Sequence, residues 1–156
     1  MTVDGTEETR LKDSFDAIGT WAHAVLTNKF VALTLGGVLG THARYWLARG
    51  INEAGWARGF PWGTLVVNLS GSFLLGLAAV LILERLPPSQ HGWFLLIGTG
   101  FCGAFTTFST FEWETFRLVR DGNFASALFN IAASVLVGFA GVVLAVMLMG
   151  LLVPRR

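Results

Sequence analysis

Charge is scarce in this sequence, and three long stretches have none at all. Only 13% of the 156 residues are charged, about half of the roughly 25% that is usual in a soluble domain. The uncharged stretches run between Arg58 and Glu84, between Arg85 and Glu112, and between Asp121 and Arg155. Each exceeds the ~20 residues that a helix needs to cross ~30 Å of hydrocarbon. The sequence therefore predicts at least three membrane-spanning helices.

Other absences narrow the functional classes. Cys102 is the single cysteine, which excludes an internal disulfide. The net charge is +1 and the basic residues are scattered, so the sequence carries no nucleic-acid signal. The three histidines, His23, His42 and His91, are far apart, and the acids lie at the ends of the predicted helices. We expect neither an enzyme nor a side-chain metal site.

Two glycine-rich segments superficially match nucleotide-binding motifs. Residues 98–103 fit G-x-G-x-x-G, but they lie inside an apolar span rather than between a strand and a helix. Residues 71–77 lack the Lys and Ser/Thr of a phosphate loop. Both matches are discarded.

A fourth, weaker span follows Lys29. His42 and Arg44 interrupt it, but a long arginine side chain near a helix end can reach the interface. We predict an all-α membrane protein with four spans, roughly 30–49, 63–84, 92–118 and 123–152. The spans form one four-helix transmembrane domain, 30–152, between an N-terminal extension, 1–29, and a basic C-terminal tail, 153–156.

The N-terminal extension is acidic early, which is unlike a secretory leader. Apolar residues recur at helical spacing at Leu11, Phe15, Ile18, Trp21 or Ala22, and Val25. This pattern fits a short amphipathic helix at the membrane interface, and a partly ordered tail fits it equally well.

The distribution of basic residues gives no clear orientation. Four spans place six basic residues on the side of the termini and five on the opposite side. Orientation normally follows an excess of Lys and Arg on the cytoplasmic side. Insertion in both orientations is one hypothesis, and a fixed orientation set by other factors is the alternative.

Uncharged polar residues form stripes inside the spans. Span two places Thr64, Asn68, Gly71 and Ser72 on one face, and span four places Asn130, Ser134 and Gly138 on one face. Close helix packing explains such stripes, and we prefer that interpretation for Gly36, Gly40, Gly71, Gly76, Gly138 and Gly141. Asn68 favours a functional interpretation, because an amide within hydrocarbon needs hydrogen-bond partners.

The segment "GTGFCGAFTTFSTFEWE", residues 98–114, combines glycine, β-branched residues and hydroxyls. This is poor helix material, because Ser and Thr compete for backbone hydrogen bonds. We predict a break near the middle of span three. Backbone groups freed at that depth form ion sites, with carbonyls for a cation and amides for an anion.

Three segments together resemble the Fluc (CrcB) fluoride channels: "GGVLGTHARYW" (36–46), "GTLVVNLSGSFLLG" (63–76) and residues 98–114. The resemblance covers residues 30–152. It implies a multi-pass protein of the cell (inner) membrane that pairs with an inverted copy of itself, a dual-topology homodimer with two antiparallel pores. It also implies a structural sodium ion at the dimer interface, held by the main-chain carbonyls of Gly103 and Thr106.

Carried over residue by residue, the resemblance implies a fluoride path along Asn68, Phe108, Ser109, Thr110, Phe111 and Ser134. Arg44 corresponds to an arginine near the aqueous vestibule that attracts anions. The family gives no fixed role to the positions of Asn130 and Gly138, and Asn130 stands where an aromatic residue is expected. The long N-terminal extension is a second departure.

The residue chemistry alone indicates only a small anion or polar solute, because neutral donors bind an anion without trapping it. Three alternatives remain: a small dual-topology multidrug exporter, a sodium-coupled transporter, and a purely structural membrane protein. The exporter would need a buried acid, whereas Glu84 and Glu112 lie at span ends.

Overall fold

The chain folds as a series of helices. The computed structural model describes residues 5–54 and 59–152, and helices account for all the regular secondary structure there. The first two helices are α1 (Gly5–Thr27) and α2 (Lys29–Glu53). The predicted basic tail, 153–156, lies outside the described residues.

Three long helices follow. The first joins α3 (Trp62–Ala78) to a π-helical end, η2 (Ala79–Arg85). The second begins with η3 (Pro88–Gln90) and α4 (Gly92–Phe94), then continues through the π-helical η4 (Leu95–Cys102), α5 (Gly103–Phe105) and α6 (Phe108–Arg120). The third consists of α7 (Phe124–Ala132), the π-helical η5 (Ala133–Val137) and α8 (Gly138–Leu152). Each long helix thus contains one π-helical segment.

These three helices have 24, 33 and 29 residues and are long and apolar enough to cross a membrane. Three of the predicted spans are therefore confirmed by length and composition. The fourth candidate, residues 30–49, falls within the 25-residue helix α2, which is not among these three. Large apolar side chains point outward from α8, such as Phe139 and Leu151, which are 70% and 83% exposed.

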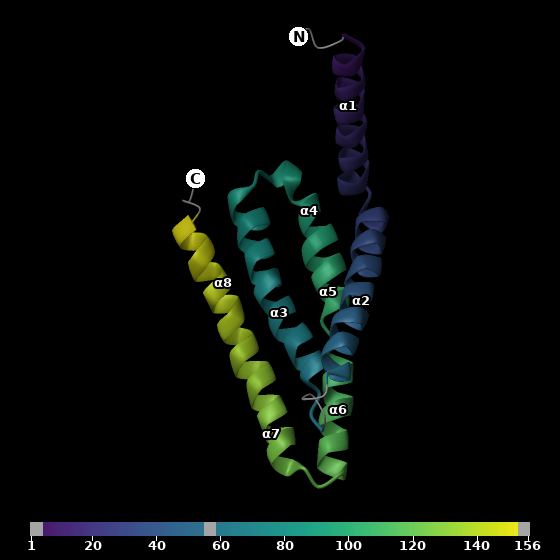
Figure 1. Ribbon diagram of the computed structural model, residues 1–156. Coiled ribbons are helices and arrows are strands. Elements are labelled where there is room, and N and C mark those ends of the chain that lie inside the picture. Colours follow the sequence, from purple (N-terminus) through teal and green to yellow (C-terminus); the bar gives the residue numbers. More distant parts are fainter. Residues whose placement is uncertain (1–4, 55–58, 153–156) are drawn as a thin grey trace.

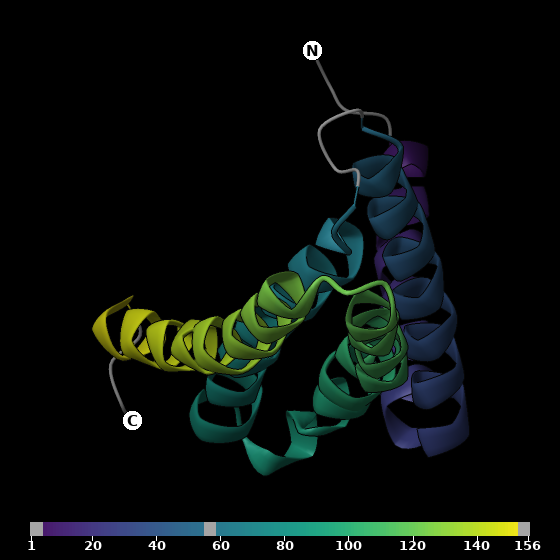
Figure 2. The same ribbon diagram turned by 90° about the horizontal axis from the view of Figure 1, so that it is seen from below.

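The helices form an elongated bundle in which α2 and α8 lie on opposite sides (Figures 1 and 2). α2 packs along η4 and α5, whereas α3 packs along α8. α2 comes closest to its neighbours at two buried glycines. A Cβ atom at Gly36 would lie 2.8 Å from the Phe101 amide nitrogen, and one at Gly40 would lie 3.0 Å from that of Phe105.

The packing interpretation of the glycines is thus confirmed for α2, and it extends to α3. A Cβ atom at Gly71 would lie 3.0 Å from the Phe105 ring, and one at Gly76 would lie 2.9 Å from the Ala145 Cβ. On α8 the neighbours are less close. A Cβ atom at Gly138 or Gly141 would make ordinary contacts at 3.7–3.9 Å.

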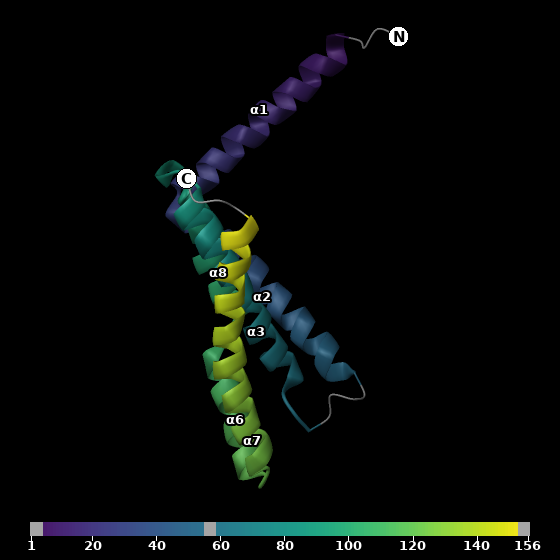
Figure 3. The same ribbon diagram turned by 90° about the vertical axis from the view of Figure 1, so that its left-hand side faces the viewer.

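The N-terminal extension is helical over a longer range than the apolar pattern from Leu11 indicates. α1 has 23 residues, and the Asn28 side chain caps the start of α2 by accepting hydrogen bonds from the amides of Phe30 and Val31. α1 extends past the end of the bundle at an angle to α2 (Figure 3). Phe15 and Trp21 are 71% and 73% exposed. The location of α1 at a membrane interface stays a prediction.

Candidate functional site

The second long helix breaks at two threonines. Thr106 and Thr107 have extended backbones, with ψ of 156° and 115°. The helix before the break ends where the Thr106 amide and hydroxyl both donate to the Cys102 carbonyl at 3.0 Å. The helix after it starts with Thr107 as its cap, because the Thr107 hydroxyl accepts from the Thr110 amide at 3.3 Å. The predicted break is confirmed.

Asn68 on α3 makes two hydrogen bonds to the backbone at this break. Its Oδ1 accepts from the Thr107 amide at 2.7 Å, and its Nδ2 donates to the Thr107 carbonyl at 3.0 Å. We predicted that the Asn68 amide needs hydrogen-bond partners within the span. Its partners are the backbone groups of a neighbouring helix. Nδ2 carries two hydrogens, so one N–H of Asn68 remains after the bond to Thr107.

The carbonyls of Gly103 and Thr106 are among those that the break affects. In a continuous helix the Thr107 amide would donate to the Gly103 carbonyl, but here it donates to Asn68. The Thr110 amide would likewise donate to the Thr106 carbonyl, but here it donates to the Thr107 hydroxyl. The oxygens of Gly103 and Thr106 thus lose their usual helical partners, and carbonyl oxygens are ligands that hard cations accept.

A cavity of about 260 Å³ lies beside the break. It brings together four of the predicted path residues, Asn68, Phe108, Phe111 and Ser134. The rings of Phe108 and Phe111 have centroids 5.6 Å apart and are tilted by 41°. Ser134 contributes a buried hydroxyl that has no hydrogen-bond partner within the part of the chain that the structure describes. None of the described residues that line the cavity is charged.

A second cavity, of about 370 Å³, lies between α2, α3 and the start of α6. Arg44 and Thr110 line it, and Thr107 lines both cavities. The two cavities therefore adjoin at the cap of α6. Ser109 is exposed on α6 and belongs to the lining of neither. Arg44 and Thr110 thus lie on one side of the break, and the two phenylalanines on the other.

The chain matches known proteins over the same region. Residues 31–146 match the family model described as "CrcB-like protein, Camphor Resistance (CrcB)". This chain belongs to the CrcB (FluC) family of fluoride-specific ion channels. Because the members of this family are ion channels, this CrcB chain is a multi-pass membrane protein and not an enzyme.

Several curated relatives carry the name "Fluoride-specific ion channel FluC". The protein of Solibacter usitatus is 48% identical over 114 residues, which cover 73% of this chain and 92% of the relative. The protein of Geobacter metallireducens is 49% identical over 117 residues, or 70% and 87% of the two chains. That of Pyrococcus furiosus is 50% identical over 107 residues, or 68% and 84%.

Asn130 of this CrcB chain lies outside both cavities. It is only 1% exposed, and its Nδ2 donates to the Thr115 hydroxyl at 2.9 Å. The Thr115 hydroxyl donates in turn to the Phe111 carbonyl at 2.8 Å. The residue that stands in place of an expected aromatic thus connects α7 to the backbone of Phe111. Gly138 is buried against Leu69 and Ser72. Asn130 and Gly138 therefore both contribute to helix packing.

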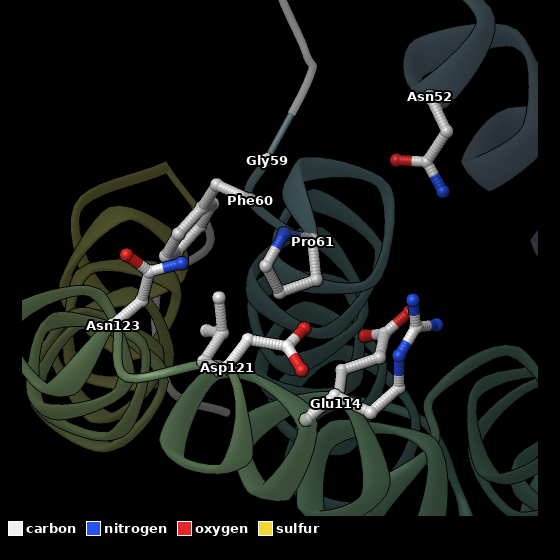
Figure 4. A pocket seen from close by; sticks show the side chains of 9 residues that line it. Asn52, Gly59, Phe60, Pro61, Glu114, Asp121 and Asn123 are labelled. Atoms are coloured by element: carbon white, nitrogen blue, oxygen red, sulfur yellow. The ribbon is translucent and has the colours of Figure 1, made fainter.

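Sequence reasoning missed a third cavity, of about 370 Å³, at the end where α6 meets α7. Glu114 and Asp121 present carboxylates on the same side of it, below Pro61 (Figure 4). Arg117 also lines it. The half-buried Glu114 has one carboxylate oxygen, Oε2, without a hydrogen-bond partner among the described residues. Glu114 follows Glu112 by two residues, where the charged end of span three begins. This second acid near the end of the span was the sequence feature that could have indicated the site.

Proposed function

We propose that this chain forms a fluoride-selective channel that exports fluoride passively and electrogenically and so lowers its cytoplasmic concentration. One observation carries the proposal: the unpartnered Ser134 hydroxyl and the remaining N–H of Asn68 line one uncharged cavity with Phe108 and Phe111. A buried polar group without a partner needs an explanation. A passing anion that accepts these hydrogen bonds provides one.

The cavity chemistry suits a small anion that must also leave. Fluoride holds its hydration water strongly, so a pore has to offer comparable hydrogen bonds. Neutral Asn and Ser donors do this without the fixed charge that would trap an anion. The aromatic ring edge carries partial positive charge, so Phe108 and Phe111 add a weak attraction. Ser109 and Thr110 extend the path as further hydroxyl donors.

The entrance to the path is the cavity that contains Arg44. A guanidinium stays charged at any relevant pH and raises the local concentration of anions. Arg44 lies in a cavity that adjoins the phenylalanine cavity at Thr107. An anion attracted there therefore reaches the path without leaving the vicinity of hydrogen-bond donors.

The working unit in this proposal is an inverted homodimer with a central sodium ion. The carbonyl oxygens of Gly103 and Thr106, two from each subunit, would hold the sodium ion. The fit is supported by the loss of their helical partners, since Thr107 and Thr110 donate elsewhere. Held by these main-chain groups at the break, sodium would supply a fixed positive charge between the subunits.

In the proposal α2 is the fourth span. Its 25 residues reach about 37 Å at 1.5 Å per residue, which exceeds the ~30 Å of a bilayer core. α2 also packs along η4 and α5 within the second long helix. With four spans both termini lie on one side, and the near-equal basic count of six and five supports insertion in both orientations. The N-terminal helix α1 lies at the interface.

Fluoride efflux from liposomes tests the function. Purified protein is reconstituted with internal potassium fluoride, and efflux is started with valinomycin and followed with a fluoride electrode. We expect rapid efflux that needs the potassium ionophore and no proton or sodium gradient, with chloride poorly conducted. Efflux equal to that of empty liposomes contradicts the channel, and dependence on a proton or sodium gradient indicates a coupled transporter.

A multidrug or sodium-coupled transporter is the second candidate. The half-buried Glu114 is the observation that favours an exporter, because proton exchange needs an acid within the protein. Glu114 lines the cavity at the end of the bundle rather than the one at the helix break. Proton-driven uptake of a cationic dye, abolished by Glu114→Gln, would support this candidate.

A further inference from the structure

The Arg44 cavity contains a second arginine that neither the polar stripes nor the family resemblance indicates. Arg49 lines the same cavity of about 370 Å³. Its side chain is 48% exposed and is held in place by three neighbours on α2. Nε donates to Glu53 Oε1 at 2.6 Å, Nη1 donates to the Tyr45 hydroxyl at 3.1 Å, and the guanidinium lies 5.7 Å from the Trp46 ring centroid.

The charges around this cavity are unequal. Among the described residues that line it, Arg44 and Arg49 are charged and none is acidic. Glu53 binds Arg49 from the next turn of α2 and is not part of the lining. The ion pair is therefore oriented, with its positive member at the cavity and its negative member farther away. Exposed pairs of this kind contribute little to stability, so stability alone gives no reason for the arrangement.

We propose that Arg49 is a second anion-collecting residue of the channel entrance, and that Glu53 limits its effect. Its ligand is the permeating small anion, so the inference rests on the proposed channel function. Arg49 lines the same cavity as Thr107 and Thr110, which lie at the start of α6. The positive charge of Arg49 concentrates anions in this cavity. An anion there is next to the phenylalanine cavity, which Thr107 also lines.

Charge variants of the pair make the inference testable. Arg49→Gln leaves Glu53 uncompensated, Glu53→Gln leaves Arg49 uncompensated, and the double variant restores neutrality. A unit charge ~8 Å away in water changes the local anion concentration by about twofold. The first variant should therefore lower, and the second should raise, the fluoride efflux rate by about twofold. The double variant should lie between Arg49→Gln and wild type, because Glu53 is farther from the cavity than Arg49, and Arg49→Lys should stay near wild type.

The matched control is Lys29→Gln, which removes one exposed positive charge at the other end of α2. Twenty residues of helix separate it from Arg49, about 30 Å. Initial efflux is measured at subsaturating fluoride in a potassium salt of a bulky organic anion, with sodium held constant. At about 10 mM salt the Debye length is ~30 Å, and at about 1 M it is ~3 Å. The differences should be present at low salt and absent at high salt.

Two results would overturn the inference. The first is an efflux rate of Arg49→Gln equal to that of Lys29→Gln at low salt. The second is an effect of the same size at both salt concentrations, which would indicate altered structure rather than an altered field. Glu53→Gln separates a folding defect from lost attraction, because its expected change is a gain. Failure of the channel function itself is distinct, since wild-type protein would then show no efflux.

Discussion

Replacement of Asn68 by leucine tests whether one side chain holds the helix break open. The change removes both hydrogen bonds to Thr107, at 2.7 and 3.0 Å. Each buried backbone group left without a partner costs about 1–3 kcal/mol, so the two together cost about 2–6 kcal/mol. The Thr107 amide can recover part of this by donating to the Gly103 carbonyl, which closes the break. Asn68→Leu should therefore lose both stability and the free carbonyl.

Fluoride efflux and thermal unfolding of the purified protein measure the two consequences. We expect efflux to fall at least tenfold and the melting temperature to drop. Ser70→Ala is the control on the same helix, because the Ser70 hydroxyl donates only to the Val66 and Val67 carbonyls of its own helix. Wild-type efflux and melting temperature in Asn68→Leu would refute the reasoning. Asn68→Asp keeps the acceptor for the Thr107 amide and should retain more stability than leucine.

Three further substitutions have defined outcomes. Phe108→Ile replaces a 71% exposed ring and should reduce fluoride efflux without changing the melting temperature; unaltered efflux would remove Phe108 from the path. Gly36→Ala should destabilise the protein by about 1–3 kcal/mol, because the new Cβ atom would overlap the backbone of the neighbouring helix. Gly37→Ala is the control and should melt like wild type, because the space around Gly37 is open. Asn130→Ala should lower the melting temperature, because it leaves a gap and removes the donor to the Thr115 hydroxyl oxygen. Equal melting temperatures would argue against a role for that bond in stability.

The sequence predicted the break in span three well because its causes are local. Glycines followed by Thr106 and Thr107 disfavour a helix whatever surrounds them. The three charge-free stretches predicted the long helices for a similar reason, since hydrocarbon admits few charges. The packing role of Gly36 also followed from residue size.

Features that depend on a partner in space were beyond the sequence. Asn68 is 39 residues from Thr107, so spacing did not indicate that its amide binds the broken backbone. Asn130 and Ser134 are four residues apart and were assigned to one face, yet one bonds Thr115 and the other lines a cavity. Arg49 and Glu114 were missed because the cavities they line are formed by several helices.

The π-helical segments affect how sequences of this kind are compared. A π turn closes its hydrogen bond over five residues instead of four, so it contains one extra residue relative to an α-helix. Each α-helical residue turns the chain by about 100°. A chain with one residue fewer in Ala133–Val137 can therefore be α-helical there and keep the same faces of α8, because the π turn absorbs a residue that would otherwise rotate those faces by about that angle. Single-residue gaps in an alignment of these spans then mark an exchange between a π turn and an α turn rather than an interrupted helix.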